Sequence, residues 1–136
     1  MDIANLPFNK VIGLKTEDTH VVLSPQPQHL NHVDTIHAAV IFGIAEAAAG
    51  QCLLCRFPDL AQDYGAVLRG ATAKYRRPAS VAQELRGIGV LDDEVAKSFF
   101  DTLQSRGRAM LDIPVSVMQG DLEVFTGTFT WFAAAK

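Results

Sequence analysis

A single carboxylate, Glu46, lies in the middle of an apolar stretch that runs from Ala38 to Ala49. No other Asp, Glu, Lys or Arg occurs between Asp34 and Arg56. Burying an unpaired carboxylate costs several kcal/mol, because the charge loses its water. Such groups gather at functional sites, where they act as general bases or nucleophiles. Glu46 is therefore the first candidate for a catalytic group, and a structural carboxylate that caps a backbone group is the alternative.

Polar residues precede the apolar stretch. Asn31 is a residue that forms Asx turns in loops. His37 stands directly before the apolar run, where a neutral imidazole can brace the loop and a helix dipole disfavours a cation. If a helix begins here, the backbone N–H groups of Ala38 and Ala39 lie in its first turn. Such N–H groups form a site for a developing negative charge.

The hydrophobic pattern predicts the elements that position these residues. The segment 36–55 is predicted to be a helix with Thr35 as its N-cap, and because it is apolar all round it must be enclosed by protein. Strands are expected to dominate the second half of the chain. The other predicted elements are a short helix within 2–14, strands at 19–23, 65–75, 81–91, 108–118 and 122–132, a helix at 92–104, and a frayed tail at 133–136. This order indicates an α+β fold in one domain, residues 1–136.

Composition narrows the classes of function. The net charge of −3 gives no basic field for nucleic acid. The first residues lack the pattern of a signal peptide, and the apolar run of 38–49 is too short to span a bilayer. A cytoplasmic protein that does not bind membranes is therefore expected. Cys52 and Cys55 have no second pair of ligands at a matching spacing, so no metal site is expected.

The residues around Glu46 resemble a known motif. Asn31, the segment D-T-I-H-A-A at 34–39 and the segment E-A-A-A-G at 46–50 are similar to the core motif of hotdog-fold acyl-CoA thioesterases, roughly N-x-x-G-T-x-H-G-G followed by an acid on the helix. The segments P-F-N-K-V-I-G-L, Y-R-R-P and R-G-R-A extend the resemblance over nearly the whole chain. It implies the hotdog fold, a curved antiparallel sheet wrapped around a long central helix. Asp34 departs from the motif's Gly, and Ala38-Ala39 from its Gly-Gly pair.

The resemblance implies hydrolysis of acyl-CoA or a related thioester, with no cofactor beyond the coenzyme A of the substrate. In that chemistry Ala38 and Ala39 stabilise the oxyanion, Glu46 acts as base or nucleophile, and Asn31 orients the thioester or the water. A hotdog protein that binds acyl-CoA or fatty acyl groups without catalysis is the alternative, because the Ala pair alters how closely a thioester can approach. The hydratase branch of the fold needs an Asp/His pair in one loop, which this spacing does not offer.

The spacing along the helix carries a further prediction. Ala38 and Glu46 are eight residues apart, which is roughly 12 Å at the helical rise of about 1.5 Å per residue. One glutamate side chain cannot reach across that distance to a carbonyl carbon held at Ala38. If both residues act on one thioester, they must come from two copies of the helix. A homodimer with two shared sites is therefore predicted, alone or within a dimer of dimers.

Lys74, Arg76 and Arg77 form the one basic cluster of the sequence. Coenzyme A carries several phosphates, and arginine binds phosphate through its planar guanidinium group. The cluster is therefore a candidate for substrate binding, and a solvated turn is the alternative.

Overall fold

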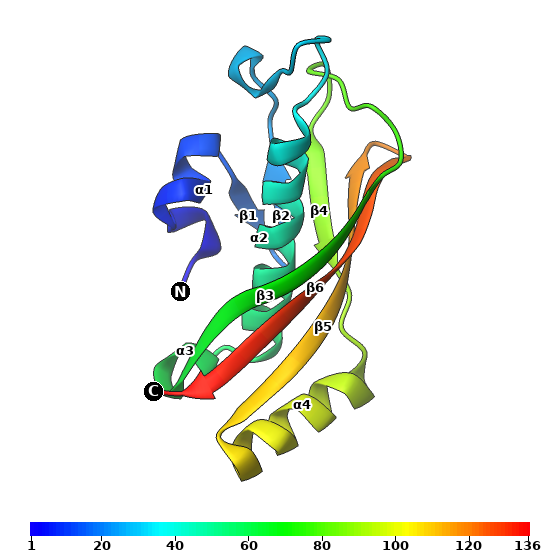
Figure 1. Ribbon diagram of the computed structural model, residues 1–136. Helices are drawn as coiled ribbons and strands as arrows, with labels where there is room; N and C mark the ends of the chain where they lie inside the picture. Colours follow the sequence, from blue (N-terminus) through cyan, green and yellow to red (C-terminus); the bar gives the residue numbers. More distant parts are fainter.

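A six-stranded antiparallel sheet curves around one long helix (Figure 1). The computed structural model describes residues 1–136, and its strand order is β1-β2-β4-β5-β6-β3. The strands are β1 (Lys15–Glu17), β2 (His20–Leu23), β3 (Tyr64–Tyr75), β4 (Leu85–Gly89), β5 (Arg108–Gln119) and β6 (Leu122–Ala135). This arrangement confirms the predicted α+β hotdog architecture.

The central helix is α2 (Ala38–Arg56), and the sheet packs closely against it. Two glycines of β4 make this approach possible: a Cβ atom on Gly87 would lie 2.9 Å from the Ala48 Cβ, and one on Gly89 would lie 2.7 Å from the Cys52 Cβ. The sequence predicts that the apolar run 38–49 is too short to span a bilayer, but by length and composition alone α2 could cross a membrane. Half of its most apolar window is buried inside the fold. It is the core helix of the domain.

Shorter elements surround this core. They are the 3₁₀-helices η1 (Ile3–Asn5) and η2 (Pro27–His29) and the helices α1 (Pro7–Ile12), α3 (Leu60–Asp63) and α4 (Asp93–Arg106). Asp92 caps α4, because its carboxylate accepts hydrogen bonds from the N–H groups of Glu94 and Val95. η1 and α1 contact α2 and lie on the side of this helix opposite β5 and β6 (Figure 1).

Two predicted boundaries are wrong. The strand predicted at 81–91 is shorter and consists of β4 alone. The residues before β4 form a loop, because the buried Gln119 side chain binds their backbone. Its amide donates to the carbonyls of Ser80 and Gln83 and accepts from the Ser80 N–H. The tail predicted to fray is part of β6, and the Lys136 N–H donates to the Asp63 carbonyl, so the chain end is tied to the start of β3.

β3 is an edge strand of twelve residues, and only β6 pairs with it. Its side chains are half-buried or exposed along its whole length. Natural proteins rarely leave so long an edge open, because its unpaired N–H and C=O groups are a template for pairing with another chain. In Figure 1, β3 runs alongside β6 and forms one edge of the sheet.

Candidate functional site

The first turn of α2 opens onto a hollow of about 240 Å³. The predicted residues Asn31, Ala38, Arg76 and Arg77 all line it. Tyr75 also lines it and donates its hydroxyl hydrogen to the Ala38 carbonyl at 3.2 Å. The sequence reasoning missed Tyr75, although its place at the end of a strand, directly before two arginines, is a signal that points to it.

His37, not the predicted Thr35, is the N-cap of α2. The Nδ1 atom of His37 accepts a hydrogen bond from the Ala39 N–H at 2.9 Å. The Ala38 N–H has no hydrogen-bond partner in the chain. Ala38 thus offers a free donor at the positive end of the helix dipole, while the N–H of Ala39 is committed to His37.

Asn31 organises the loop that leads into α2. Its side-chain oxygen accepts hydrogen bonds from the N–H groups of Val33 and Thr35, and its amide nitrogen donates to the Thr35 hydroxyl. These are the contacts of an Asx turn, so Asn31 holds the loop, and Thr35 is occupied there and does not cap the helix. Asp34 adopts a left-handed conformation with φ of 60°. That conformation suits glycine, which is the residue of the hotdog motif at this position.

His29, at the start of the same loop, connects it to α1. His32 is exposed, whereas His29 is buried. Its Nδ1 accepts from the Gln26 N–H, and its Nε2 is 2.9 Å from the Ile12 carbonyl. The ring therefore links η2 to the end of α1 through both of its nitrogens.

Glu46 lies at a second cavity, of about 300 Å³, that is separate from the hollow at Ala38. The cavity is mostly apolar, and the carboxylate of Glu46 has no hydrogen-bond or ion-pair partner in the chain. Burial raises the pKa of Glu46 above its ordinary value of 4.5. The geometry is that of a desolvated base, with no structural partner that would explain the carboxylate.

The side chains of the basic cluster do not all point to the same face of the sheet, because successive side chains along β3 alternate between its two faces. Tyr75 packs edge-on against Phe125 on the helix side of the sheet, so Lys74 points to the opposite face. Arg76 donates to the Thr126 hydroxyl at 2.8 Å and pairs with Glu123 at 3.5 Å. Arg77 has no side-chain partner in the chain. Of the three predicted residues, the structure therefore places both arginines at the hollow and leaves Lys74 outside it.

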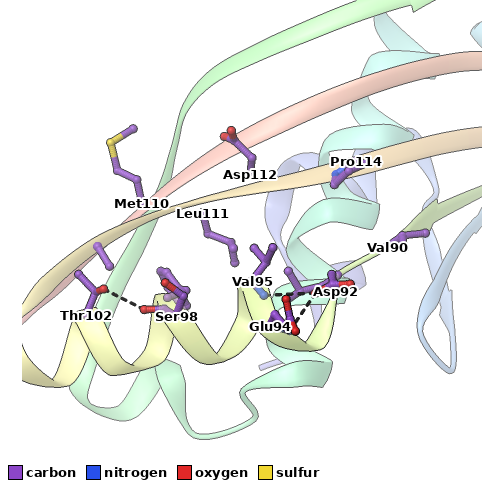
Figure 2. A pocket seen from close by; sticks show the side chains of 13 residues that line it. Val90, Asp92, Glu94, Val95, Ser98, Thr102, Met110, Leu111, Asp112 and Pro114 are labelled. Carbon is purple, nitrogen blue, oxygen red and sulfur yellow. Dashed lines mark hydrogen bonds between the residues drawn. The ribbon is translucent and has the colours of Figure 1, made fainter.

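The largest hollow of the molecule, about 640 Å³, lies elsewhere, between α4 and β5 (Figure 2). Asp92, Glu94 and Asp112 line it together with Val95 and Met110, and none of the predicted site residues does. The two cysteines are unpaired: Cys52 is buried against β4, and Cys55 is exposed. Neither feature contributes to the site around α2.

Comparison with solved structures identifies the fold. A probable thioesterase, PA5026 of Pseudomonas aeruginosa, matches with a TM-score of 0.83 and 19% identity over 98% of this chain and 91% of that chain. A mutant of the phenylacetic acid degradation protein PaaI from Thermus thermophilus matches with a TM-score of 0.65 and 21% identity, over 93% and 98%. BH2602 from Bacillus halodurans, solved with CoA, matches with a TM-score of 0.71 and 18% identity, over 93% and 74%.

No curated protein matches the sequence. Residues 9–133 match the family described as "Domain of unknown function (DUF4442)". The match covers the whole of α2 and all six strands up to the last residues of β6. The chain therefore belongs to the DUF4442 family and has the hotdog fold of thioesterase-like proteins.

Proposed function

We propose that the protein hydrolyses acyl-CoA or a closely related acyl thioester. One observation carries the proposal: α2 presents a free N–H at Ala38 and, about two turns further along, an unpartnered and desolvated carboxylate at Glu46. The first can hold a developing oxyanion, and the second can remove a proton from water. The similarity to a probable thioesterase and to a protein solved with CoA supports the same chemistry.

The two groups act on one thioester only if two chains share the site. Ala38 lies at the Tyr75 end of β3, whereas the Glu46 cavity is lined by Tyr64, Gly65 and Ala66 at the strand's other end. A second copy that pairs its β3 antiparallel with this open edge brings its Tyr64 end beside the Tyr75 end of the first. The partner's Glu46 cavity then adjoins the first chain's Ala38 hollow. We therefore propose a homodimer with two shared sites.

The reaction at each shared site follows from these positions. The Glu46 carboxylate takes a proton from a water molecule as the water oxygen attacks the thioester carbonyl carbon. The Ala38 N–H of the other chain holds the negative charge on the carbonyl oxygen. When the tetrahedral intermediate collapses, the C–S bond breaks and the proton passes from Glu46 to the departing thiolate. The products are a carboxylic acid and a free thiol.

Release of free thiol from a panel of acyl-CoAs tests the proposed reaction. The proposal predicts turnover of at least one apolar acyl-CoA. Tight binding with no thiol release would instead support a non-catalytic acyl-CoA-binding protein. The occupied N–H of Ala39 is the observation that favours this alternative, since it leaves one oxyanion donor where the Gly-Gly motif suggests two.

Arg77 is proposed to bind a phosphate of coenzyme A, because it lines the Ala38 hollow and has no partner in the chain. Arg77→Ala should raise KM for acyl-CoA about 3- to 10-fold, which corresponds to the net contribution of about one ordinary hydrogen bond at an exposed site. It should also make KM less sensitive to salt. Initial rates at two salt concentrations measure both effects.

Lys74→Ala is the matched control for Arg77→Ala. It removes the same charge from the same strand-to-turn segment, but on the opposite face of the sheet. KM should not change in this variant. Equal effects of the two substitutions would mean that only the general positive charge of the segment matters, and an unchanged KM in Arg77→Ala would remove Arg77 from the site.

A further inference from the structure

One face of α2 runs from the Glu46 carboxylate into the apolar cavity. Glu46, Gly50 and Leu54 are four residues apart, so they lie one above another on the helix, and all three line the cavity. Gly50 has no side chain, so Ile3 and Trp131 approach the α2 backbone closely just beyond the carboxylate. Leu54 stands about 12 Å along the axis from Glu46, at the helical rise of about 1.5 Å per residue.

Most of the side chains that form the walls of the cavity are apolar. η1 and the start of β3 form two walls, with Ile3 and Leu6 on one and Tyr64 and Ala66 on the other. Trp131 lies against Gly50, since a Cβ atom on Gly50 would be 3.5 Å from the indole ring. The only charged side chains that line it are Glu46 and Lys136, and the Lys136 ammonium donates to the Ala61 and Gln62 carbonyls. Because most of the lining is apolar, the cavity favours an uncharged, apolar acyl tail.

We propose that this cavity binds the acyl group of the substrate, and that Gly50 and Leu54 set its length. The inference rests on the proposed thioesterase function, because it places the thioester carbonyl beside Glu46. At roughly 30 Å³ for each small group, as for a water molecule in the liquid, a cavity of about 300 Å³ holds about ten non-hydrogen groups. The substrate class is therefore an uncharged, apolar acyl group of medium length, or an aryl-acetyl group of the same size.

The test is binding of non-hydrolysable thioether analogues of acyl-CoA with increasing chain length, measured by calorimetry on the wild-type protein. Affinity should rise about fourfold with each added methylene, the factor that corresponds to burying one CH₂. It should stop rising near about ten carbons, the length that fills the cavity. A steady rise well beyond that length, or no dependence on length, would overturn the proposal.

Gly50→Ala adds one methyl group inside the cavity. The new Cβ lies 3.3 Å from the Ile3 Cδ1, which is the flexible end of a side chain, and alanine is the better residue in a helix interior, so the variant should fold. The length limit should fall by one or two carbons. Gly43→Ala is the matched control, because its Cβ meets the Ile12 Cδ1 at 3.1 Å on the same helix but outside the cavity. It should leave the limit unchanged.

Leu54→Ala removes the side chain at the far end and should raise the length limit by about three carbons, one for each side-chain carbon that is lost. The same limit in Gly50→Ala, Gly43→Ala and Leu54→Ala would overturn the assignment of this cavity. Length-limited binding that responds to Gly50 and Leu54, combined with no thiol release from the parent thioesters, would support the acyl site and contradict the proposed hydrolysis. The two proposals can thus fail separately.

Discussion

Replacing Glu46 by Gln should lower turnover of acyl-CoA by about 10²- to 10⁴-fold, the contribution typical of a positioned general base. Glutamine has nearly the same size as glutamate, and the carboxylate of Glu46 makes no hydrogen bond or ion pair that the exchange would break. The loss therefore reports the missing base and not a change of shape. KM should change little, since the substitution alters the chemical step and leaves the arginines in place. Thiol release at saturating substrate measures the effect.

The same substitution should make the protein more stable at neutral pH. Burial raises the pKa of Glu46, so the folded protein binds this proton more tightly than the unfolded chain does. The protonated form therefore favours folding below the ordinary value of 4.5, and that advantage is lost as the pH rises through the raised pKa. Above it the ionised carboxylate is a cost that Glu46→Gln removes.

Thermal unfolding across pH separates these two effects. The variant should exceed the wild type in Tm at neutral pH, and the gap should close as the pH falls to the ordinary value of 4.5 or below. In the wild type, kcat/KM should rise with pH as Glu46 loses its proton. Glu94→Gln, at an exposed carboxylate on α4, should change neither activity nor the pH profile. Full activity in Glu46→Gln would contradict the catalytic role.

Replacing Ala38 by Pro should lower kcat by about 10²- to 10³-fold, the loss seen when one oxyanion donor is removed. Proline has no N–H, and Ala38 is the first residue of α2, where proline is well accepted. His37 has φ of −60° and ψ of 137°, which is the conformation favoured before proline. The variant should therefore keep its fold and lose one hydrogen-bond donor.

Ala38→Ser is the control for this substitution. Serine is small and retains the backbone N–H, so kcat should remain within a few-fold of the wild type. Circular dichroism and Tm of both variants check that α2 is intact. If Ala38→Pro folds and keeps the activity of Ala38→Ser, the Ala38 N–H is not the oxyanion donor.

Much of the fold follows from local pattern. An Ala- and Gly-rich helix with no polar face must be enclosed, and two glycines of β4, Gly87 and Gly89, supply the close approach that the sheet then needs. The pattern wrongly predicts that a strand begins directly after Ser80. This segment is a loop, because it is held by Gln119, a side chain 39 residues away from Ser80 in sequence. No local window contains that information.

Part of the lining of the Ala38 hollow could be predicted from the sequence, but the hydrogen-bond partners of the predicted residues could not. Asn31 and His37 were singled out by type and position, yet only the three-dimensional structure shows that one holds the Asx turn and the other occupies the Ala39 N–H. Lys74 was grouped with two arginines because it is near them in sequence. Strand alternation then places it on the other face of the sheet, which follows once Tyr75 is known to face α2.

The shared site at a two-chain interface is the central claim, and complementation between two inactive variants tests it most directly. Glu46→Gln chains and Ala38→Pro chains are mixed, unfolded and refolded together, and thiol release is compared with each parent treated alone. Random pairing makes half of the dimers mixed, and each mixed dimer has one intact site of two, so about a quarter of wild-type activity should return. Activity that stays at the level of the parents, in mixtures shown to contain mixed dimers, would contradict a site shared between two chains.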